Sequence, residues 1–554
     1  MNGAQLTVAA LRREGIDHVF GLPGTTVMHL IDALGEVDDI RFVPVRHEQV
    51  AAMMADGFAR GSGRLGACLA SRGPGAANLA IGVHNACAES IPMLVLVGQV
   101  PDAIVHRDSF EEMDLLRFFE PMTKWAVEIH ETNRIPELLQ RAVRTALSGR
   151  PGPVLVSLPL DVQLRREESV LQPRFRLSPT APNPADVDAS LTLLAESERP
   201  VIIVGGGMQG STFDEDLIIL AERLHVPVVT TWGRKGVFPN DSELFCGSLG
   251  YGALATTVSA VQDADVILAL GCKFSEFTTK RWSLLPDRAE LIHVDVSEEV
   301  LGRVYVPTVA ICADARVTTA AMRAAAKSHI EHAAAVDARR QRVRALRAAY
   351  VEETQIPELA TPPSGVSSAA VTEALRTILD SNRAVVINDA SSMGAWLQRH
   401  LTIAQPAGYY IAAGGSLGWG LPAAMGIQLS RPEDRIIGLI GDGSFWMVAQ
   451  DLETAVRENI PVVVVIANNF SFGNTRDRQR VEHGGRYSGV FYGNPDFAEF
   501  ARLLGAHGER VEAASELVPA IQRALDSGRP AVVDVIQDRS EGLPPDLVPP
   551  PAAE

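Results

Sequence analysis

Apolar runs alternate with helical stretches along almost the whole chain. Short runs of Val, Ile, Leu and Ala, such as residues 266–270 and 462–467, contain no polar side chain. Runs of this kind are typical of strands that are buried on both faces of a parallel sheet. Turns rich in Gly and Pro separate them from the helical stretches. The alternation predicts an α/β fold of doubly wound parallel sheets covered by helices.

Three blocks of similar size repeat this pattern. At 554 residues the chain is too long for a single core, and the sequence TAPNP at residues 180–184 reads as a linker. A loose connection at residues 356–364 separates the second block from the third. We therefore predict three domains and a Pro-rich tail, at residues 1–165, 184–327, 366–536 and 537–554.

Composition and charge narrow the possible partners. The chain has 46% hydrophobic and 21% charged residues, and its net charge of −17 argues against a nucleic-acid partner. We see no signal peptide and no run of about 18 apolar residues, so we expect no membrane contact and a cytoplasmic location. The five cysteines lack CxxC spacing and are expected to be free thiols.

Residues 436–469, IIGLIGDGSFWMVAQDLETAVRENIPVVVVIANN, predict a strand, a tight turn, a helix and a second buried strand. A βαβ crossover brings the carboxyl ends of both strands to one edge of the sheet, where α/β proteins bind ligands. Asp442 and Asn469 are therefore expected to meet around a cation such as Mg²⁺. Gly443 and Ser444 offer N–H groups to an anion. A plain turn with a solvated Asp442 is the alternative.

The GDGS turn, followed at this distance by two asparagines, resembles the thiamine-diphosphate signature of the superfamily of acetohydroxyacid synthase, pyruvate decarboxylase and benzoylformate decarboxylase. The resemblance implies an enzyme in which Asp442, Asn469 and the carbonyl of Ser471 hold Mg²⁺, which anchors the cofactor's diphosphate. It also implies that the three domains are pyrimidine-binding, nucleotide-binding-like and diphosphate-binding, in that order.

Glu48 lies at a predicted strand-to-helix junction among apolar residues. From its position alone it is equally typical of a residue that favours a helix start. The surrounding sequence VRHEQVAAMMADGFAR, followed by SRGPGAANLAIGVHNA, is similar to the pyrimidine-binding domain of the superfamily. That resemblance implies that Glu48 hydrogen-bonds N1′ of the aminopyrimidine and so promotes deprotonation of the thiazolium C2.

A glycine-rich segment, YYIAAGGSLGWGLP at residues 409–422, precedes a predicted buried helix. It is similar to the family segment that bends the cofactor. By this resemblance Leu417 lies between the two rings and the carbonyl of Gly415 accepts from the 4′-amino group. Ser391 and Ser392, at another strand end, either contact the diphosphate or cap a helix. In the superfamily Glu48 and the Mg²⁺ site belong to different subunits, which implies a homodimer or homotetramer acting on a small molecule.

The residues expected near the substrate differ from those of the known members of the superfamily. Residues 106–114, HRDSFEEMD, match a family loop that reaches the reactive carbon, so Phe110 and Glu111 join Glu48 as catalytic candidates. Acetohydroxyacid synthases have Gln at the Glu111 position, and an acid there is similar to oxalyl-CoA decarboxylase. Favourable acids at a helix N-terminus would give the same pattern. Ala70 occupies the place of the benzoylformate decarboxylase histidine, which argues against that mechanism. Residues 472–487 are expected to form part of the substrate pocket.

The central domain is a candidate to bind a nucleotide in addition to thiamine diphosphate. Acetohydroxyacid synthases hold FAD there, but their phrase RFDDR is KFSEF in this chain, without the second basic residue, so FAD is not expected. The triple glycine at residues 205–207 is a nucleotide-like turn. Arg150, Lys273 and Asp295 are candidates to bind ADP or the nucleotide of CoA. Alternatively, Asp295 only ends a strand and Arg150 only braces the domain.

Three functional hypotheses follow. The first is a thiamine-diphosphate lyase of the 2-hydroxyacyl-CoA lyase or oxalyl-CoA decarboxylase type, which gives a carbonyl compound and formyl-CoA; Glu111 and the altered FAD phrase favour it. The second is an acetolactate-synthase-like carboligase that acts on pyruvate or another 2-keto acid. The third is a non-catalytic binding protein, against which the intact Glu48, Asp442 and Asn469 speak.

Overall fold

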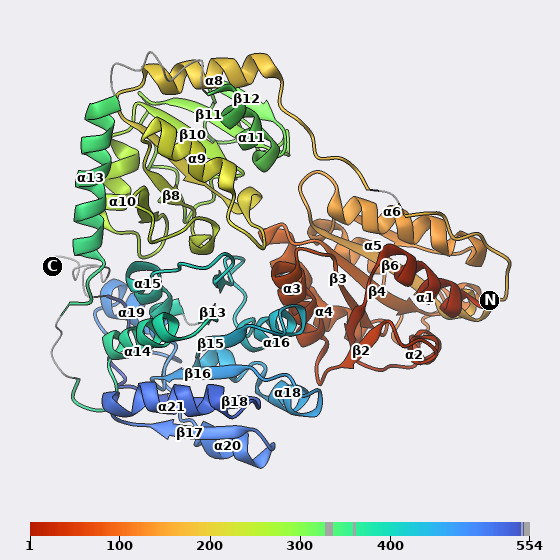
Figure 1. Ribbon diagram of the computed structural model, residues 1–554. Coiled ribbons are helices and arrows are strands. Elements are labelled where there is room, and N and C mark those ends of the chain that lie inside the picture. The colour runs from red at the N-terminus through yellow and green to blue at the C-terminus, as the bar shows by residue number, and fades with distance from the viewer. Residues whose placement is uncertain (175, 327–335, 358–361, 390, 545–546, 548–554) are drawn as a thin grey trace.

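Three parallel six-stranded sheets, each flanked by helices, make up the protein (Figure 1). The computed structural model describes all residues except 175, 327–335, 358–361, 390, 545–546 and 548–554. The predicted connection at 356–364 and the Pro-rich tail therefore lie partly outside the described residues. The sheets confirm the predicted α/β class, since strands buried on both faces need helices on both sides.

The first sheet has the strand order β2-β1-β3-β4-β6-β5. Its strands are β1 (His18–Gly21), β2 (Arg41–Pro44), β3 (Gly66–Ala70), β4 (Met93–Gln99), β5 (Trp125–Glu128) and β6 (Pro153–Pro159). The helices around it are α1 (Gly3–Glu14), α2 (Met28–Gly35), α3 (Glu48–Ser62), α4 (Pro74–Glu89), α5 (Leu115–Phe119), α6 (Ile135–Leu147) and α7 (Leu160–Leu164).

The third sheet repeats this arrangement, with the order β14-β13-β15-β16-β18-β17. Its strands are β13 (Ala384–Asp389), β14 (Tyr409–Ile411), β15 (Arg435–Gly441), β16 (Val463–Asn468), β17 (His507–Val511) and β18 (Ala531–Ile536). Its helices are α14 (Ser368–Ser381), α15 (Ser391–His400), α16 (Gly420–Ser430), α17 (Asp442–Phe445), α18 (Leu452–Arg457), α19 (Gly473–Glu482), α20 (Phe497–Leu503) and α21 (Ala514–Asp526).

The second sheet differs, with the order β12-β11-β10-β7-β8-β9. This is the strand order of dinucleotide-binding domains, in which both halves run outward from the two central strands. Its strands are β7 (Pro200–Val204), β8 (Val228–Thr230), β9 (Phe245–Ser248), β10 (Val266–Leu270), β11 (Glu290–Asp295) and β12 (Val309–Cys312). Its helices are α8 (Pro184–Glu196), α9 (Glu215–Leu224), α10 (Ala255–Gln262), α11 (Ala315–Ala325) and α13 (Val336–Glu353).

The first and third domains share one hydrophobic core, in which α3 packs against α16. The two helices approach so closely that a Cβ on Gly426 would lie 2.1 Å from the carbonyl oxygen of Met54. A Cβ on Gly57 would lie 2.4 Å from that of Ala423. Glycine on both sides therefore allows the contact. None of the described helices has the length and apolar character needed to cross a bilayer.

One predicted element is wrong in its extent. The single helix predicted within residues 436–469 is divided into the short α17, a 3-10 turn at Ala449–Asp451 and then α18. Asp451 is fully buried, and its Oδ1 accepts from the backbone N–H of Arg46 at 2.8 Å. The helix therefore restarts at Leu452, where the chain meets the first domain.

Candidate cofactor site

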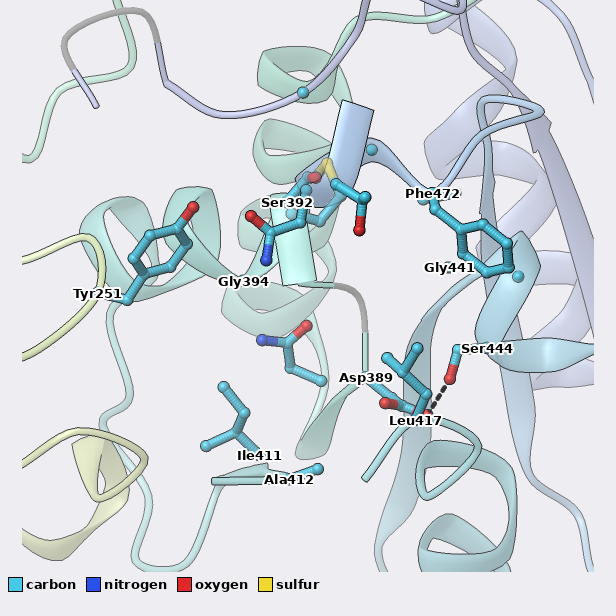
Figure 2. A pocket seen from close by; sticks show the side chains of 18 of the residues that line it. Tyr251, Asp389, Ser392, Gly394, Ile411, Ala412, Leu417, Gly441, Ser444 and Phe472 are labelled. Atoms are coloured by element: carbon cyan, nitrogen blue, oxygen red, sulfur yellow. Dashed lines mark hydrogen bonds between the residues drawn. The ribbon is translucent and has the colours of Figure 1, made fainter. Parts of the chain in front are cut away.

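A cavity of about 460 Å³ lies at the carboxyl edge of the third sheet (Figure 2). The strand order changes direction there, between β13 and β15, which is where open α/β sheets bind ligands. Among the described residues, those that line the cavity come from the second and third domains and from the segment that follows them (Gln537, Glu541 and Gly542), and none comes from the first domain. The predicted cofactor and metal residues that line it are Ser392, Gly415, Leu417, Asp442, Gly443, Ser444, Asn469 and Ser471.

Asp442 follows β15 and is held firmly at the edge of the cavity. Its Oδ1 accepts from Gly443 N at 2.9 Å and Tyr492 Oη at 3.0 Å. Its Oδ2 accepts from Phe470 N and Asn494 Nδ2, both at 2.8 Å. Burial raises the pKa of this carboxyl, while the four donors favour its ionised form. These contacts fix the position of the carboxylate, so that it could serve as an oxygen ligand of a cation.

Asn469 follows β16, the strand next to β15, so the predicted meeting of Asp442 and Asn469 at one edge is present. The Oδ1 of Asn469 accepts from Ser471 N at 3.2 Å and Ser471 Oγ at 3.1 Å. Its Nδ2 donates to the carbonyl of Glu541 at 3.1 Å. A carboxylate, an amide oxygen and the backbone of Ser471 thus provide the hard oxygen donors that suit Mg²⁺.

Ser444 connects the turn after β15 to two other segments. Its hydroxyl donates to Asp389 Oδ2 at 2.5 Å and accepts from Gly418 N at 2.6 Å (Figure 2). Burial raises the pKa of Asp389 to about 7. The side chain of Ser444 therefore holds the loop that carries Leu417. The sequence predicts only an anion site at its backbone N–H group.

Gly415 and Leu417 lie on the loop between β14 and α16. Gly415 has φ +86°, a conformation that favours glycine, and a Cβ there would meet no atom within 4 Å. A side chain would instead project into the cavity that the residue lines. Leu417 is 37% exposed, and the backbone N–H of the next residue, Gly418, donates to the Ser444 hydroxyl. The cavity thus has a polar end near Asp442 and an apolar projection near Leu417.

Ser392 lies near the start of α15 and lines the cavity, and a Cβ on Gly473 would lie 2.9 Å from its hydroxyl. The side chain of Ser391 lies outside the described residues. Residues 472–475, part of the predicted substrate segment, also line the cavity.

Glu48 stands at the start of α3, on the first domain and outside this cavity. It is buried, and its Oε2 accepts from Asn78 Nδ2 at 2.9 Å. A Cβ on Gly75 would lie 3.1 Å from its Oε1, so a glycine leaves that oxygen room. Phe110 and Glu111 lie next to the same turn, since a Cβ on Gly73 would lie 2.5 Å from the Glu111 carbonyl oxygen. The three predicted catalytic residues therefore form one surface.

Family models match all three domains. They are the N-terminal TPP binding domain of thiamine pyrophosphate enzymes over residues 1–118, the central domain over residues 187–322, and the C-terminal TPP binding domain over residues 389–535. The chain belongs to the thiamine pyrophosphate enzyme family. Thiamine pyrophosphate is the cofactor named thiamine diphosphate above, so the predicted superfamily is confirmed.

Relatives within this family extend over nearly the whole chain. A probable acetolactate synthase large subunit of Methanocaldococcus jannaschii is 33% identical, over 99% of this chain and 94% of that protein. The acetolactate synthase isozyme 2 large subunit of Escherichia coli is 31% identical, over 100% and 98%. The acetolactate synthase large subunit of Corynebacterium glutamicum is 32% identical, over 97% and 87%. These names favour the hypothesis of an acetolactate-synthase-like carboligase over that of an acyl-CoA lyase.

A second cavity of this family member, of about 580 Å³, is lined mainly by residues of the central and first domains. Arg150, Lys273 and Asp295 all line it, together with Gly206 and Gly207 of the triple glycine. Arg150 Nε donates to Ser90 Oγ at 2.7 Å, and Lys273 Nζ donates to the carbonyl of Ala88, so both cations contact the end of α4. Burial lowers the pKa of Lys273 to about 8. The predicted nucleotide residues are thus brought together, and Arg150 also braces the domain.

Sequence reasoning does not identify some residues that support or line the cofactor cavity. Tyr492 and Asn494 reach Asp442 from a loop far along the chain, and no motif marks them. Trp232, Tyr251 and Phe277 enter from the second domain. Of these three, only Phe277 lies in a motif named above, as the last residue of KFSEF at 273–277.

Proposed function

We propose that this family member is a thiamine-diphosphate-dependent carboligase of the acetolactate synthase type, acting on pyruvate or another 2-keto acid. The full-length similarity to acetolactate synthase large subunits carries the proposal. In the simplest reaction, two pyruvate ions and one proton give one acetolactate ion and one CO₂. A new C–C bond forms to the keto carbon of the second pyruvate, and the bond to the first carboxylate breaks.

The residues of the 460 Å³ cavity fit thiamine diphosphate and Mg²⁺. Asp442 and Asn469 provide hard oxygen donors, and the missing side chain at Gly415 leaves room for a ligand against the backbone. When bound, the cofactor supplies a carbon nucleophile and an electron sink. Leu417 would separate its two rings, and Ser392, Gly443 and Ser444 would contact its diphosphate.

Glu48 would exchange a proton with N1′ of the cofactor across a subunit boundary. This is supported by the observation that no described residue of the first domain lines the cavity of its own chain. Several large apolar side chains on the third domain are also exposed, namely Leu417, Trp446, Met447, Phe472, Tyr487 and Phe491. A second copy of the chain would cover such surface. A homodimer is therefore the minimum assembly, and a homotetramer is compatible with it.

A nucleotide such as ADP, or that of CoA, is our proposal for the 580 Å³ cavity. Lys273 and Arg234, on a domain with the dinucleotide-binding strand order, supply positive charge there, and Arg150 of the first domain adds to it. Trp232 and Phe277, whose ring centroids lie 4.5 Å apart, line both cavities. Because this aromatic pair stands between the two cavities, it favours a ligand that ends there over the longer FAD.

The acyl-CoA lyase remains the second candidate. Glu111, beside Arg72, and the basic central cavity are the observations that favour it. One panel separates the two functions: purified protein with thiamine diphosphate and Mg²⁺ is offered pyruvate, 2-ketobutyrate, oxalyl-CoA and a 2-hydroxyacyl-CoA. We expect acetolactate from pyruvate without CoA. Formyl-CoA from the CoA esters, with no product from either keto acid, would overturn the proposal.

A further inference from the structure

The cofactor cavity has no cation of its own for an anionic substrate. Its described lining includes the acids Asp389, Asp442 and Glu541, but no Lys, Arg or His. A 2-keto acid carries a carboxylate, and burying a carboxylate without an opposite charge is strongly unfavourable. If the proposed function holds, the compensating charge must come from the surface that closes the cavity.

Arg72 is a cation next to Glu48 in the first domain. It lies in the turn between β3 and α4, directly before Gly73, which contacts Glu111. Two residues further along, Gly75 contacts Glu48. Arg72, Glu48 and Glu111 therefore belong to one continuous surface, built from a single turn and the loop beside it.

Only the Nε of the Arg72 guanidinium makes a hydrogen bond to the described residues. Its side chain is 12% exposed, and its Nε donates to the carbonyl of Phe110 at 2.8 Å. The Nε lies 3.7 Å from Glu111 Oε2, and the guanidinium lies 5.8 Å from the centre of the Phe110 ring. The N–H groups of its two terminal nitrogens make no hydrogen bond to the described residues. They form the two-pronged edge that binds a carboxylate in bidentate fashion.

The loop over Arg72 is held in an unusual conformation. His106, Asp108 and Glu111 all have positive φ, at 64°, 56° and 59°, which costs free energy for residues other than glycine. Glu112 holds the loop by accepting from His106 N at 2.8 Å, and Arg72 holds it through the Phe110 carbonyl. Backbone strain of this kind gathers at ligand sites, and here it fixes Phe110 and Glu111 around the guanidinium.

We propose that Arg72 of one chain binds the carboxylate of the 2-keto acid in the cavity of its partner, and so selects anionic substrates. The inference rests on the proposed function and names a substrate-specificity residue for it. Glu111 orients the guanidinium from one side, and Phe110, which is 77% exposed, excludes water beside it. Arg72 thus supplies the positive charge that the described lining of the cavity lacks.

The test measures how Arg72→Gln changes the binding of two competitive ligands that have a similar shape but a different charge. The holoenzyme is used for both proteins. Oxamate is an unreactive anion shaped like pyruvate, and pyruvamide is its neutral counterpart. We expect the inhibition constant of oxamate to rise about 10- to 100-fold, as for loss of a charged hydrogen-bonded pair, and that of pyruvamide to change less than about threefold. Arg72→Lys should recover part of the oxamate affinity. Arg107→Gln, which removes an exposed charge from the same loop, should change neither constant.

Each contrary outcome has one meaning. Unchanged oxamate affinity in Arg72→Gln, in an enzyme that turns over pyruvate, overturns the inference and leaves the proposed function standing. An equal loss for oxamate and pyruvamide assigns Arg72 a role in holding the loop alone, and also overturns the inference. A wild-type enzyme that turns over no 2-keto acid overturns the proposed function, and the inference with it.

Discussion

The first and third sheets have the same strand order, yet their carboxyl edges carry opposite chemistry. After the third strand of each sheet in chain order, β3 leads into Arg72 and β15 leads into Asp442. After the second strand, β2 leads to Glu48 and β14 leads to Gly415 and Leu417. Shared topology places a ligand edge at the same point of both sheets, and the residues in the turns decide what that edge can hold.

The same correspondence extends to the helices that join the two domains. Helix α3 follows the second strand of the first sheet, and α16 follows the second strand of the third. The two equivalent helices pack against each other through glycines. The two edges are thus rigidly related within a chain, although Glu48 does not enter the cavity of that chain.

Removing the cation ligand of the third edge should have the largest effect. Asp442→Ala should abolish binding of Mg²⁺ and diphosphate, and the reaction should slow by about 10⁶-fold, the smallest acceleration typical of enzymes. The measurement is the rise of the melting temperature on adding thiamine diphosphate and Mg²⁺, which should vanish in the variant. Glu433→Ala, an exposed acid just before the other end of β15, should keep the rise. A full rise in Asp442→Ala would contradict the assignment.

Changing the acid of the first edge should spare cofactor binding. Glu48→Gln should lower kcat by about 10² to 10⁴-fold, as for loss of a general acid–base, while the cofactor still raises the melting temperature. Hydrogen–deuterium exchange at C2 of bound thiamine diphosphate should slow in parallel. The exposed Glu36→Gln serves as the control. Exchange at the wild-type rate in Glu48→Gln would remove Glu48 from this role.

The contact between the two equivalent helices can be tested by filling it. Gly426→Ala would place a methyl group 2.1 Å from the carbonyl oxygen of Met54, and should lower the free energy of unfolding by about 1 to 3 kcal/mol. Gly35→Ala is the matched control, because a Cβ there meets nothing within 4 Å. Chemical denaturation of the two variants provides the comparison. Equal stability would show that α3 and α16 are not held this closely.

The smallest effect concerns pH at the junction of the two domains. Burial raises the pKa of Asp451 to about 6, above the value of 3.8 usual for this group. Between these two pH values the folded state therefore binds a proton that the unfolded state does not bind. The protonated Asp451 contributes to the free energy of unfolding in full below pH 3.8, and this contribution is lost as the pH rises through about 6. Asp451→Asn should remove about 1 to 3 kcal/mol of this dependence. Identical pH profiles of unfolding would exclude Asp451 as its source.

Local pattern was sufficient to place Asp442 and Asn469, because a βαβ unit confines both strand ends to one edge. It did not identify Tyr492 and Asn494, which reach Asp442 through tertiary contacts from a loop without regular pattern. Strands β5 and β17 are partly exposed and have no continuous apolar run, so the pattern of buried strands does not predict them. The proposed role of Arg72 is also not predictable from local sequence. It depends on the lack of Lys, Arg and His among the described residues that line a cavity outside the first domain.

The central claim is that each active site takes Glu48 from one chain and Asp442 from another. It is tested most directly by mixing Glu48→Gln and Asp442→Ala proteins, unfolding and refolding them together, and measuring acetolactate formation. Each variant alone should be inactive, whereas every mixed dimer would carry both substitutions in one site and none in the other, and mixed dimers make up half of all dimers under random pairing. The mixture should thus regain about a quarter of the wild-type activity for random pairing. A mixture as inactive as its parts, with pairing verified, would contradict a site shared between chains.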